Sequence, residues 1–146
     1  MKPVINRKVR FHYEILETLE AGIVLTGAEV KSVKKGQVDI SNAYVTIKND
    51  EIFLINASIP RYKFAPADES YDPTRSRKLL LKKSQIQSLK GYLTQKGLTL
   101  TAIKVYTKRN KVKVEIALVK GKKKFDKRED IRRRQHEKEM RNIKSF

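Results

Sequence analysis

The feature that most limits the possible folds is a strict two-residue alternation near the end of the chain. Between residues 111 and 119, polar or small side chains alternate with four apolar ones, Val112, Val114, Ile116 and Leu118. Successive side chains of a β-strand point to opposite faces, so this segment predicts a strand with one buried face. Residues 98–107 are predicted to be its hairpin partner. There the apolar phase shifts by one residue between Ala102 and Ile103, which predicts a β-bulge.

Earlier segments predict further strands. Residues 12–25 fit a long first strand, in which Gly22 permits a bulge or a bend. Residues 43–48 and 51–57 alternate around Asn49-Asp50 and predict a hairpin. Residues 78–81 fit a short buried strand. The first six residues are expected to form a flexible arm, and residues 60–73 a long loop because they contain three prolines.

Two helices are predicted from the residues at their ends. Thr26 and Glu29 have the spacing of a capping box, and Gly36 supplies a C-terminal stop, so residues 26–36 predict a short helix. Ser84 and Gln87 have the same spacing at the start of residues 84–96, which predict the second helix.

Together these patterns predict a mainly β fold with about six strands and two short helices. A small antiparallel barrel of the oligonucleotide-binding type is the first expectation, and a split α+β sandwich is the second. Aromatic side chains on strands are expected in the core. The 146 residues fit one domain, which we place at residues 1–120. Residues 121–146 hold eleven Lys or Arg and few apolar side chains, so we expect a basic tail that stays unfolded until a partner binds it.

The distribution of charge indicates the class of partner. The net charge is +18, yet residues 1–70 carry ten basic and nine acidic side chains, whereas residues 71–146 carry twenty-four and seven. A basic half of this kind attracts nucleic acid. A membrane surface is not the expected partner, because the basic tail has no large apolar face to insert. No apolar run approaches the roughly 20 residues of a membrane span either. The N-terminus lacks the apolar segment of a secretory signal, so a cytoplasmic protein is expected.

No catalytic constellation is evident, so the chain is not predicted to be an enzyme. It has no cysteine, and its two histidines, His12 and His136, are too few for a zinc site. Acidic residues cluster in the long loop at Asp68, Glu69 and Asp72, but a solvated loop is the simpler interpretation. We therefore predict neither a metal nor a cofactor.

The residues that suit RNA binding are aromatic or basic. Tyr62 and Phe64 lie in the long loop, where packing does not explain them, and an aromatic ring there can stack on a base. Arg75, Arg77 and Lys78 follow a turn and are candidate phosphate contacts.

Several segments, in this order, also carry a resemblance to a known family. They are NRKVR at 6–10, FHYEI at 11–15, LEAGIVLTGAEVKSVKKG at 19–36, SNAYV at 41–45, DPTRSRKLLL at 72–81, KGLTL at 96–100 and GKKKFDKRED at 121–130. Over essentially its whole length the chain resembles the small protein B family, the SsrA-binding proteins of bacteria. The chain departs from the usual family residues at two sites, the Phe11-His12 pair and Phe125, where Tyr or His is common.

The resemblance implies an oligonucleotide-binding-like barrel, without catalytic activity, that binds the tRNA-like domain of transfer-messenger RNA. It also implies entry into stalled ribosomes with elongation factor Tu, as a monomer, in trans-translation. The positions that face this RNA in the family correspond to Asn6, Glu20, Tyr44 and Leu80. An acid such as Glu20 cannot hold a phosphate, but it can accept hydrogen bonds from base amino groups or sugar hydroxyls.

The resemblance assigns a separate role to the tail, which becomes helical in the empty messenger channel and signals to the decoding centre. Gly121 corresponds to the hinge between barrel and tail. The tail positions carried over are Lys122, Lys123, Lys124, Phe125, Asp126, Lys127, Arg128, Ile143 and Lys144. The alternative interpretation is a general RNA-binding or ribosome-associated barrel with a basic tail.

Overall fold

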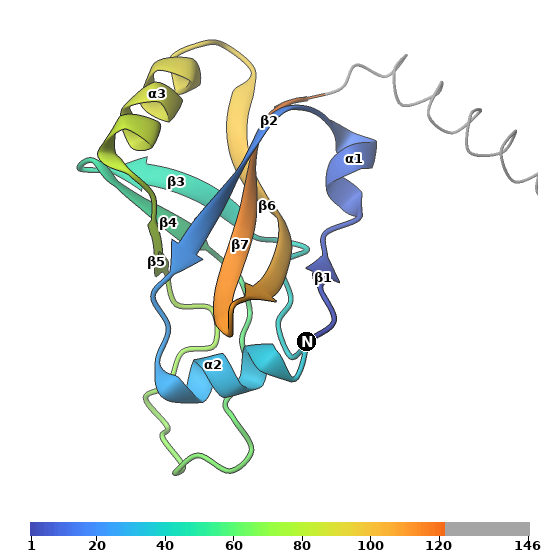
Figure 1. The fold of residues 1–146 in the computed structure, drawn as a ribbon, viewed down its shortest axis with the longest axis vertical. Coiled ribbons are helices and arrows are strands. Elements are labelled where there is room, and N and C mark those ends of the chain that lie inside the picture. Colours follow the sequence, from blue (N-terminus) through green and yellow to red (C-terminus); the bar gives the residue numbers. More distant parts are fainter. Residues whose placement is uncertain (122–146) are drawn as a thin grey trace, which may run out of the picture.

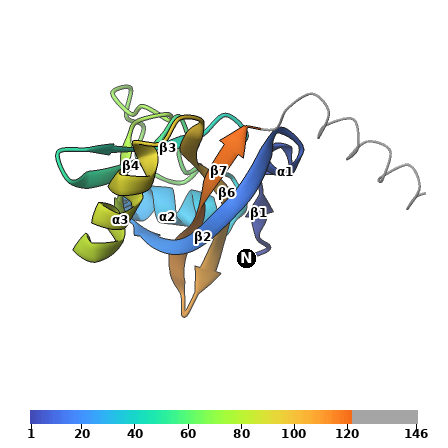
Figure 2. The same ribbon diagram turned by 90° about the horizontal axis from the view of Figure 1, so that it is seen from above.

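The computed structural model describes residues 1–121. This part contains three helices, α1 (Lys8–His12), α2 (Gly27–Lys34) and α3 (Lys83–Leu93). Its strands are β1 (Val4–Ile5), β2 (Tyr13–Ile23), β3 (Tyr44–Lys48), β4 (Glu51–Ile55), β5 (Arg77–Leu80), β6 (Leu98–Lys108) and β7 (Lys111–Gly121). In Figure 1, α2 lies across one end of the strands and α3 lies at the other. Seen from above, α1 and α3 lie on opposite sides of the strands (Figure 2).

All seven strands form one antiparallel sheet in the order β1-β6-β3-β4-β5-β2-β7. β6 and β7 also pair with each other, so the strands from β6 to β7 form a closed hydrogen-bonded circuit, and β1 pairs with β6 outside it. The link between β3 and β6 rests on one residue pair, Val45 with Leu100. The prediction of a mainly β, antiparallel fold with short helices is confirmed. The described residues form one more strand and one more helix than predicted, because β1 and α1 were not expected.

Both predicted hairpins are present. β3 and β4 pair in register around Asn49 and Asp50, whose φ angles of 52° and 61° place them in the left-handed region that tight hairpin turns use. β6 and β7 pair over their whole length. The pairing register shifts between Ala102 and Lys104, so the bulge predicted from the apolar phase shift is confirmed.

The bulge expected at Gly22 is absent, because the register of β2 shifts between Ile15 and Glu17 instead. Gly22 pairs with Leu80 of β5 on one side and with Lys113 of β7 on the other. A Cβ atom at Gly22 would lie 3.2 Å from the Cβ of Leu80. Glycine therefore permits a close approach of β5 to β2 at this position.

The first residues are part of the fold, contrary to the expected flexible arm. Val4 and Ile5 pair with β6, and the α1 helix that follows ends at His12, which was predicted as the start of a strand. Val9 of α1 packs with Ala117 and Val119 in a small second core. α1 thus covers the face of β7 that the alternation assigned to solvent, so β7 is buried on both faces there.

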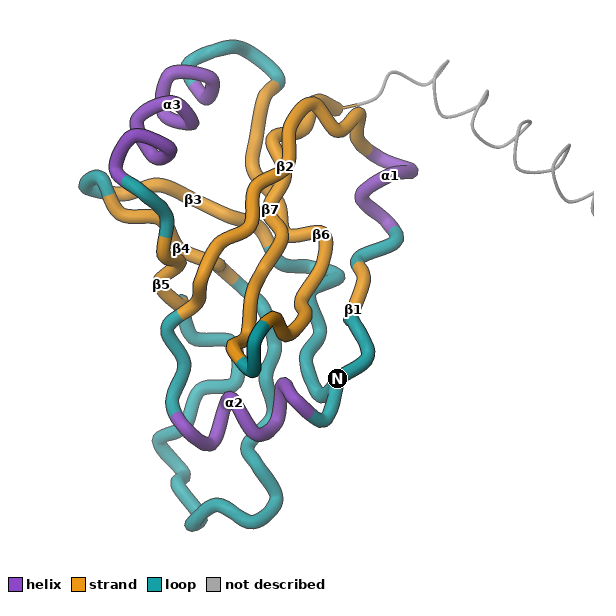
Figure 3. The backbone as a smooth tube through the Cα atoms, viewed as in Figure 1, coloured by secondary structure: helices purple, strands orange, loops and turns teal. Residues whose placement is uncertain are grey.

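The two predicted helices differ in accuracy. At α2 the capping box is confirmed: Glu29 N–H donates to Thr26 Oγ1, and Thr26 N–H donates to Glu29 Oε1. At α3 the predicted Ser84–Gln87 box is wrong, because the helix begins earlier and Lys82 N–H donates to Gln85 Oε1. Between β4 and β5 no helix or strand forms, and this long loop runs past α2 (Figure 3).

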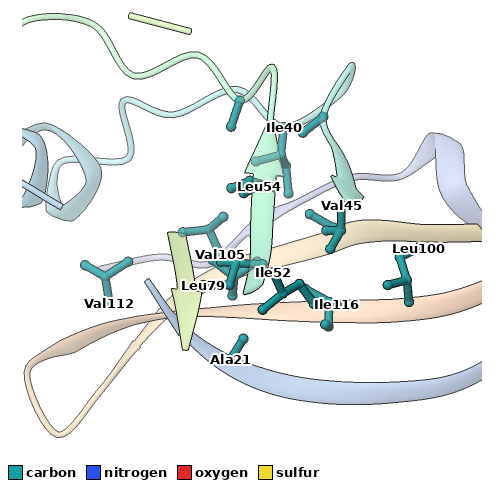
Figure 4. Packing of buried hydrophobic residues seen from close by; sticks show 14 of the residues in the cluster. Ala21, Ile40, Val45, Ile52, Leu54, Leu79, Leu100, Val105, Val112 and Ile116 are labelled. Carbon is teal, nitrogen blue, oxygen red and sulfur yellow. The ribbon is translucent and has the colours of Figure 1, made fainter. Parts of the chain in front are cut away.

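The main core lies inside the sheet and consists of aliphatic side chains. Ile52, Leu54, Leu79, Ile116 and Leu100 are among its most buried members (Figure 4). None of the aromatic side chains in the described part is buried, so the expectation of a partly aromatic core is wrong. The aromatic rings are instead half-buried or exposed, where they remain available to a partner.

Candidate nucleic-acid interface

The pairing register brings two of the predicted RNA-facing residues onto one outer face. Ala21 points into the core, so its neighbours Glu20 and Gly22 face outward. Gly22 lies opposite Leu80 in the β2–β5 pair, and Glu20 is two residues away on the same strand. Leu80 is 52% exposed because the glycine beside it offers no side chain to cover it. Glu20 and Leu80 therefore share a surface.

Glu20 is surrounded by donors. Its Oε2 accepts a hydrogen bond of 2.6 Å from the Tyr106 hydroxyl, and Lys108 Nζ lies 3.4 Å from the same oxygen. The hydrogen bond from Tyr106, with the charge of Lys108, holds the pKa of Glu20 below its usual range. Glu20 is thus ionised at neutral pH. Among residues 1–121 the hydrogen bonds of its carboxylate all use Oε2, so Oε1 can accept from a base or a ribose.

A basic pocket of about 330 Å³ surrounds this carboxylate, lined by Glu20, Lys108, Arg109, Lys111 and Lys113. The basic residues come from β6, β7 and the turn between them. Such an arrangement can hold a backbone phosphate on the lysines while the acid reads a neighbouring donor group.

Lys78 lies on β5 two residues before Leu80, and it is exposed. Its Nζ lies 3.6 Å from Oε1 of Glu51, an exposed pair that contributes little to stability. Lys78 is therefore free to contact phosphate on the same outer surface as Leu80.

Tyr44 and Asn6 lie at a second location. Tyr44 begins β3 and is 51% exposed. It lines a pocket of about 320 Å³ together with Asn6 and with Lys8 and His12 of α1. The pocket thus combines an exposed ring with basic and amide groups, which suits a nucleotide.

Asn6 is buried, so its side chain is mainly a structural link. Its Nδ2 donates to the carbonyls of Ile40, at 3.0 Å, and Ala102, at 3.3 Å. Its Oδ1 is buried and has no hydrogen-bond partner within the described residues. Asn6 thereby fixes the entry to α1, which forms one wall of the Tyr44 pocket.

Arg77 is not placed to contact phosphate, contrary to the sequence prediction. It is 0% exposed, and its guanidinium donates to Glu29 Oε2, at 2.8 Å, and to the carbonyls of Ala57 and Pro73. Arg75, which is partly exposed, also forms an ion pair with Glu29. Both arginines therefore join β5 and the long loop to the start of α2, and a phosphate role for Arg77 is wrong for this conformation.

Glu29, the carboxylate that Arg75 and Arg77 share, is 1% exposed. Burial alone would raise the pKa of Glu29, but hydrogen bonds from the Thr26 N–H and from Arg75 and Arg77 outweigh it and lower the pKa to about 2. Glu29 was predicted only as a capping residue. Its second role had no local signal, because Arg77 lies 48 residues away along the chain.

Of the predicted tail residues, Gly121 alone lies within the described residues. Gly121 is the last residue of β7 and pairs with Tyr13, and a Cβ atom there would meet nothing within 4 Å. The other predicted tail residues lie outside the described residues, namely Lys122, Lys123, Lys124, Phe125, Asp126, Lys127, Arg128, Ile143 and Lys144.

The acidic loop residues have local partners. Asp68 Oδ1 accepts from the N–H and hydroxyl of Ser70, and Asp72 Oδ1 accepts from those of Thr74. Within residues 1–121, no group of three or more His, Cys, Asp or Glu side chains is placed to hold a metal ion. The helices in that range are also too short or too polar to cross a membrane.

The chain is similar to known proteins along almost its whole length. The family model described as SmpB protein matches residues 4–145. An SsrA-binding protein of Nostoc sp. strain PCC 7120 is 50% identical over 135 residues, which cover 92% of this chain and 87% of that protein. The SsrA-binding protein of Nostoc punctiforme is 49% identical over 142 residues, which cover 97% and 92%.

One solved structure is also similar. It is described as "tmRNA-SmpB: a journey to the center of the bacterial ribosome", and it is 41% identical in sequence with a TM-score of 0.70. The alignment covers 91% of this chain and 96% of that chain.

Proposed function

Because the chain belongs to the SmpB family, we propose that it binds the tRNA-like domain of transfer-messenger RNA and delivers this RNA to stalled ribosomes for trans-translation. The observation that carries the proposal is the family match over residues 4–145, which includes both the sheet and the basic tail. The solved structure described as tmRNA–SmpB supports it, since that chain has a similar fold.

The geometry of the outer face supports the RNA partner. An ionised acid lies among lysines beside an exposed leucine, and a tyrosine opens a second pocket next to α1. We infer that Glu20 accepts hydrogen bonds from base or ribose groups, and that Leu80 and Tyr44 pack on bases or sugars. Lys78 and the lysines near Glu20 hold the phosphates. Asn6 acts by holding the α1 wall of the second pocket.

The proposal divides the chain into two parts with different roles. Residues 1–120 act as the oligonucleotide-binding-like barrel that selects the RNA. Residues 121–146 enter the messenger channel and report to the decoding centre that no codon is present, with Gly121 as the hinge. The protein acts as a cytoplasmic monomer, without catalytic activity, and travels with elongation factor Tu.

The experiment that tests this function is recovery of the tagged full-length chain from a bacterial lysate, followed by sequencing of the bound RNA. One dominant RNA with a tRNA-like end supports the proposal. A broad mixture of tRNA and rRNA fragments contradicts it. Loss of intact RNA in a metal-supplemented incubation would instead indicate an RNA-processing enzyme.

A general RNA-binding protein is the second candidate, because the net charge of +18 alone gives affinity for any RNA. Removal of residues 122–146 separates the two candidates. The proposed function requires that the truncated chain still binds the tRNA-like domain while rescue of stalled ribosomes is lost. A general binder would lose most of its RNA affinity with the tail.

A further inference from the structure

A second aromatic surface lies on the long loop, away from Glu20 and Tyr44. Tyr62 and Phe64 lie beside three lysines: Lys31 from α2, Lys35 directly after α2, and Lys63 from the loop itself. We call these five residues the loop patch. Phe64 is 70% exposed, the largest value among the exposed large apolar side chains of the described part. The loop projects past α2 at the end of the molecule opposite to α3 (Figure 1).

The patch has a defined geometry. The rings of Tyr62 and Phe64 are 5.6 Å apart and meet edge to face, with an interplanar angle of 68°. The ammonium of Lys35 lies 5.2 Å from the centre of the Tyr62 ring and 5.4 Å from that of Phe64. Lys31 lies 5.5 Å from the Tyr62 ring, and Lys63 lies 5.6 Å from the Phe64 ring. Cations at these distances orient the rings and remain at the surface.

Polar contacts hold the loop at both ends, while the Phe64 ring is exposed. Its start is fixed by a hydrogen bond of 2.9 Å from Ser32 Oγ to the Pro60 carbonyl, and Arg61 Nη1 donates to the Ala65 carbonyl at 2.6 Å. Its far side is fixed by the Tyr71 hydroxyl, which donates to the Ile59 carbonyl at 2.7 Å. The loop is thus anchored by polar groups, while a Phe ring that could be buried favourably is left in water.

We propose that the loop patch is a second RNA contact, in which the base of an unpaired nucleotide stacks on Phe64, with Tyr62 against the edge of the stack, while the phosphates bind the lysines. Stacked bases need an aromatic face, and the adjoining phosphates need cations within a few ångströms, and the patch supplies both. An acidic peptide would pair with the lysines but leave the rings without a stacking partner. The inference goes beyond the proposed function, which uses the surface around Glu20, Leu80 and Tyr44.

The chain has no tryptophan, so Phe64→Trp introduces a single reporter and keeps an aromatic ring at the patch. The probe is a short unstructured oligouridylate, titrated into the full-length Phe64→Trp chain, with binding followed in parallel by anisotropy of a labelled oligonucleotide. We expect the Trp emission to be quenched as the oligonucleotide binds. Phe64→Ala should weaken the same binding at least about fivefold, the lower limit for one stacked base.

Two controls isolate the stacking contact. An abasic oligonucleotide of the same length carries the phosphates without bases, and it should bind without comparable quenching. Tyr92→Trp places the reporter on α3, on another exposed aromatic position, and should show little quenching. Equal quenching by the abasic oligonucleotide, equal quenching at Tyr92→Trp, or no quenching at saturation would each overturn the proposal. The proposal would also be overturned if a polyglutamate peptide changed the Phe64→Trp emission and the oligouridylate did not.

The same variant separates this proposal from the proposed function. Phe64→Ala should bind the isolated tRNA-like domain as the unchanged chain does, because the patch is separate from that surface. If Phe64→Ala weakens the tRNA-like domain as much as the oligouridylate, the patch belongs to the first site and the claim of a second contact is wrong.

Discussion

Arg77 and Glu29 form a buried ion pair that joins β5 to the start of α2. Arg77 Nε donates to Glu29 Oε2 at 2.8 Å, and Nη2 lies 2.7 Å from the same oxygen. Arg77 also donates to the carbonyls of Ala57 and Pro73, so it holds the loop between β4 and β5 as well. Two of the segments that carry the family resemblance, 19–36 and 72–81, thus meet at this pair. The pair thereby fixes β5, the strand that carries Leu80, against the start of α2.

Removal of Arg77 should destabilise the fold. Arg77→Met leaves the Glu29 carboxylate buried with fewer partners, and breaking a buried pair in this way typically costs about 3–5 kcal/mol. Urea unfolding followed by circular dichroism measures the loss. The matched control is Lys78→Met, since this neighbour is exposed and its change should stay within about 0.5 kcal/mol. An Arg77→Met chain with normal stability but weaker RNA binding would show that Arg77 contacts RNA after all.

Lowering the pH should reduce the stability of the fold, because Glu29 becomes protonated. Its folded pKa is about 2 and its ordinary value is 4.5, so the folded state binds a proton less readily than the unfolded state. The stabilisation is therefore complete above about pH 4.5 and is lost as the pH falls towards 2. Urea midpoints at a series of pH values test this, with Glu29→Gln as the reference. The difference between the two chains should shrink on acidification, and a constant difference would contradict the assignment.

Much of the fold could be predicted because the signals are local. The two hairpins, the bulge after Ala102 and the capping box at Thr26 follow from residues a few positions apart. The missed β1 strand and the second role of Glu29 concern partners that are distant in sequence, whereas the capping box at α3 was misplaced by two residues. β1 pairs with β6 about a hundred residues later, and Glu29 lies 48 residues from Arg77, so neither pairing leaves a periodic trace.

In the candidate site, too, the contacts between residues distant in sequence were the ones that could not be predicted. Glu20, Tyr44 and Leu80 came from the family resemblance, and the structure places all three at the surface. Arg77 was assigned from its charge alone, and its buried partner could not be seen locally. The donor to Glu20, Tyr106, lies 86 residues away and was also missed as a partner.

Gly22→Ala should test the close approach of β2 and β5. The added Cβ would lie 3.2 Å from the Cβ of Leu80, and overpacking of this kind costs about 1–3 kcal/mol. Replacing a glycine also stabilises by about 0.4–1 kcal/mol through the unfolded chain, so a net loss of about 1 kcal/mol is expected. In a Leu80→Gly background the Cβ that would be contacted is absent, and Gly22→Ala should become neutral or stabilising. Equal effects in both backgrounds, measured by urea unfolding, would exclude the contact.

Glu20→Gln should change selectivity more than stability, because Glu20 is on the surface. The variant loses an ionised acceptor and one negative charge, so binding to transfer-messenger RNA should weaken while binding to unrelated RNA stays equal or increases. Tyr106→Phe is the matched control, since it removes the donor and keeps the carboxylate. Competition binding of the two RNAs at fixed salt gives the selectivity. A uniform loss for both RNAs would show that Glu20 does not read the RNA.

The most direct test of the account compares two dissociation constants for the full-length chain at physiological salt. One is for the tRNA-like domain of transfer-messenger RNA, and the other is for bulk tRNA, whose charge is similar. We predict much tighter binding to the tRNA-like domain, with the advantage reduced by Glu20→Gln. Equal affinity for the two RNAs would mean that charge alone drives binding, and would contradict the proposed function.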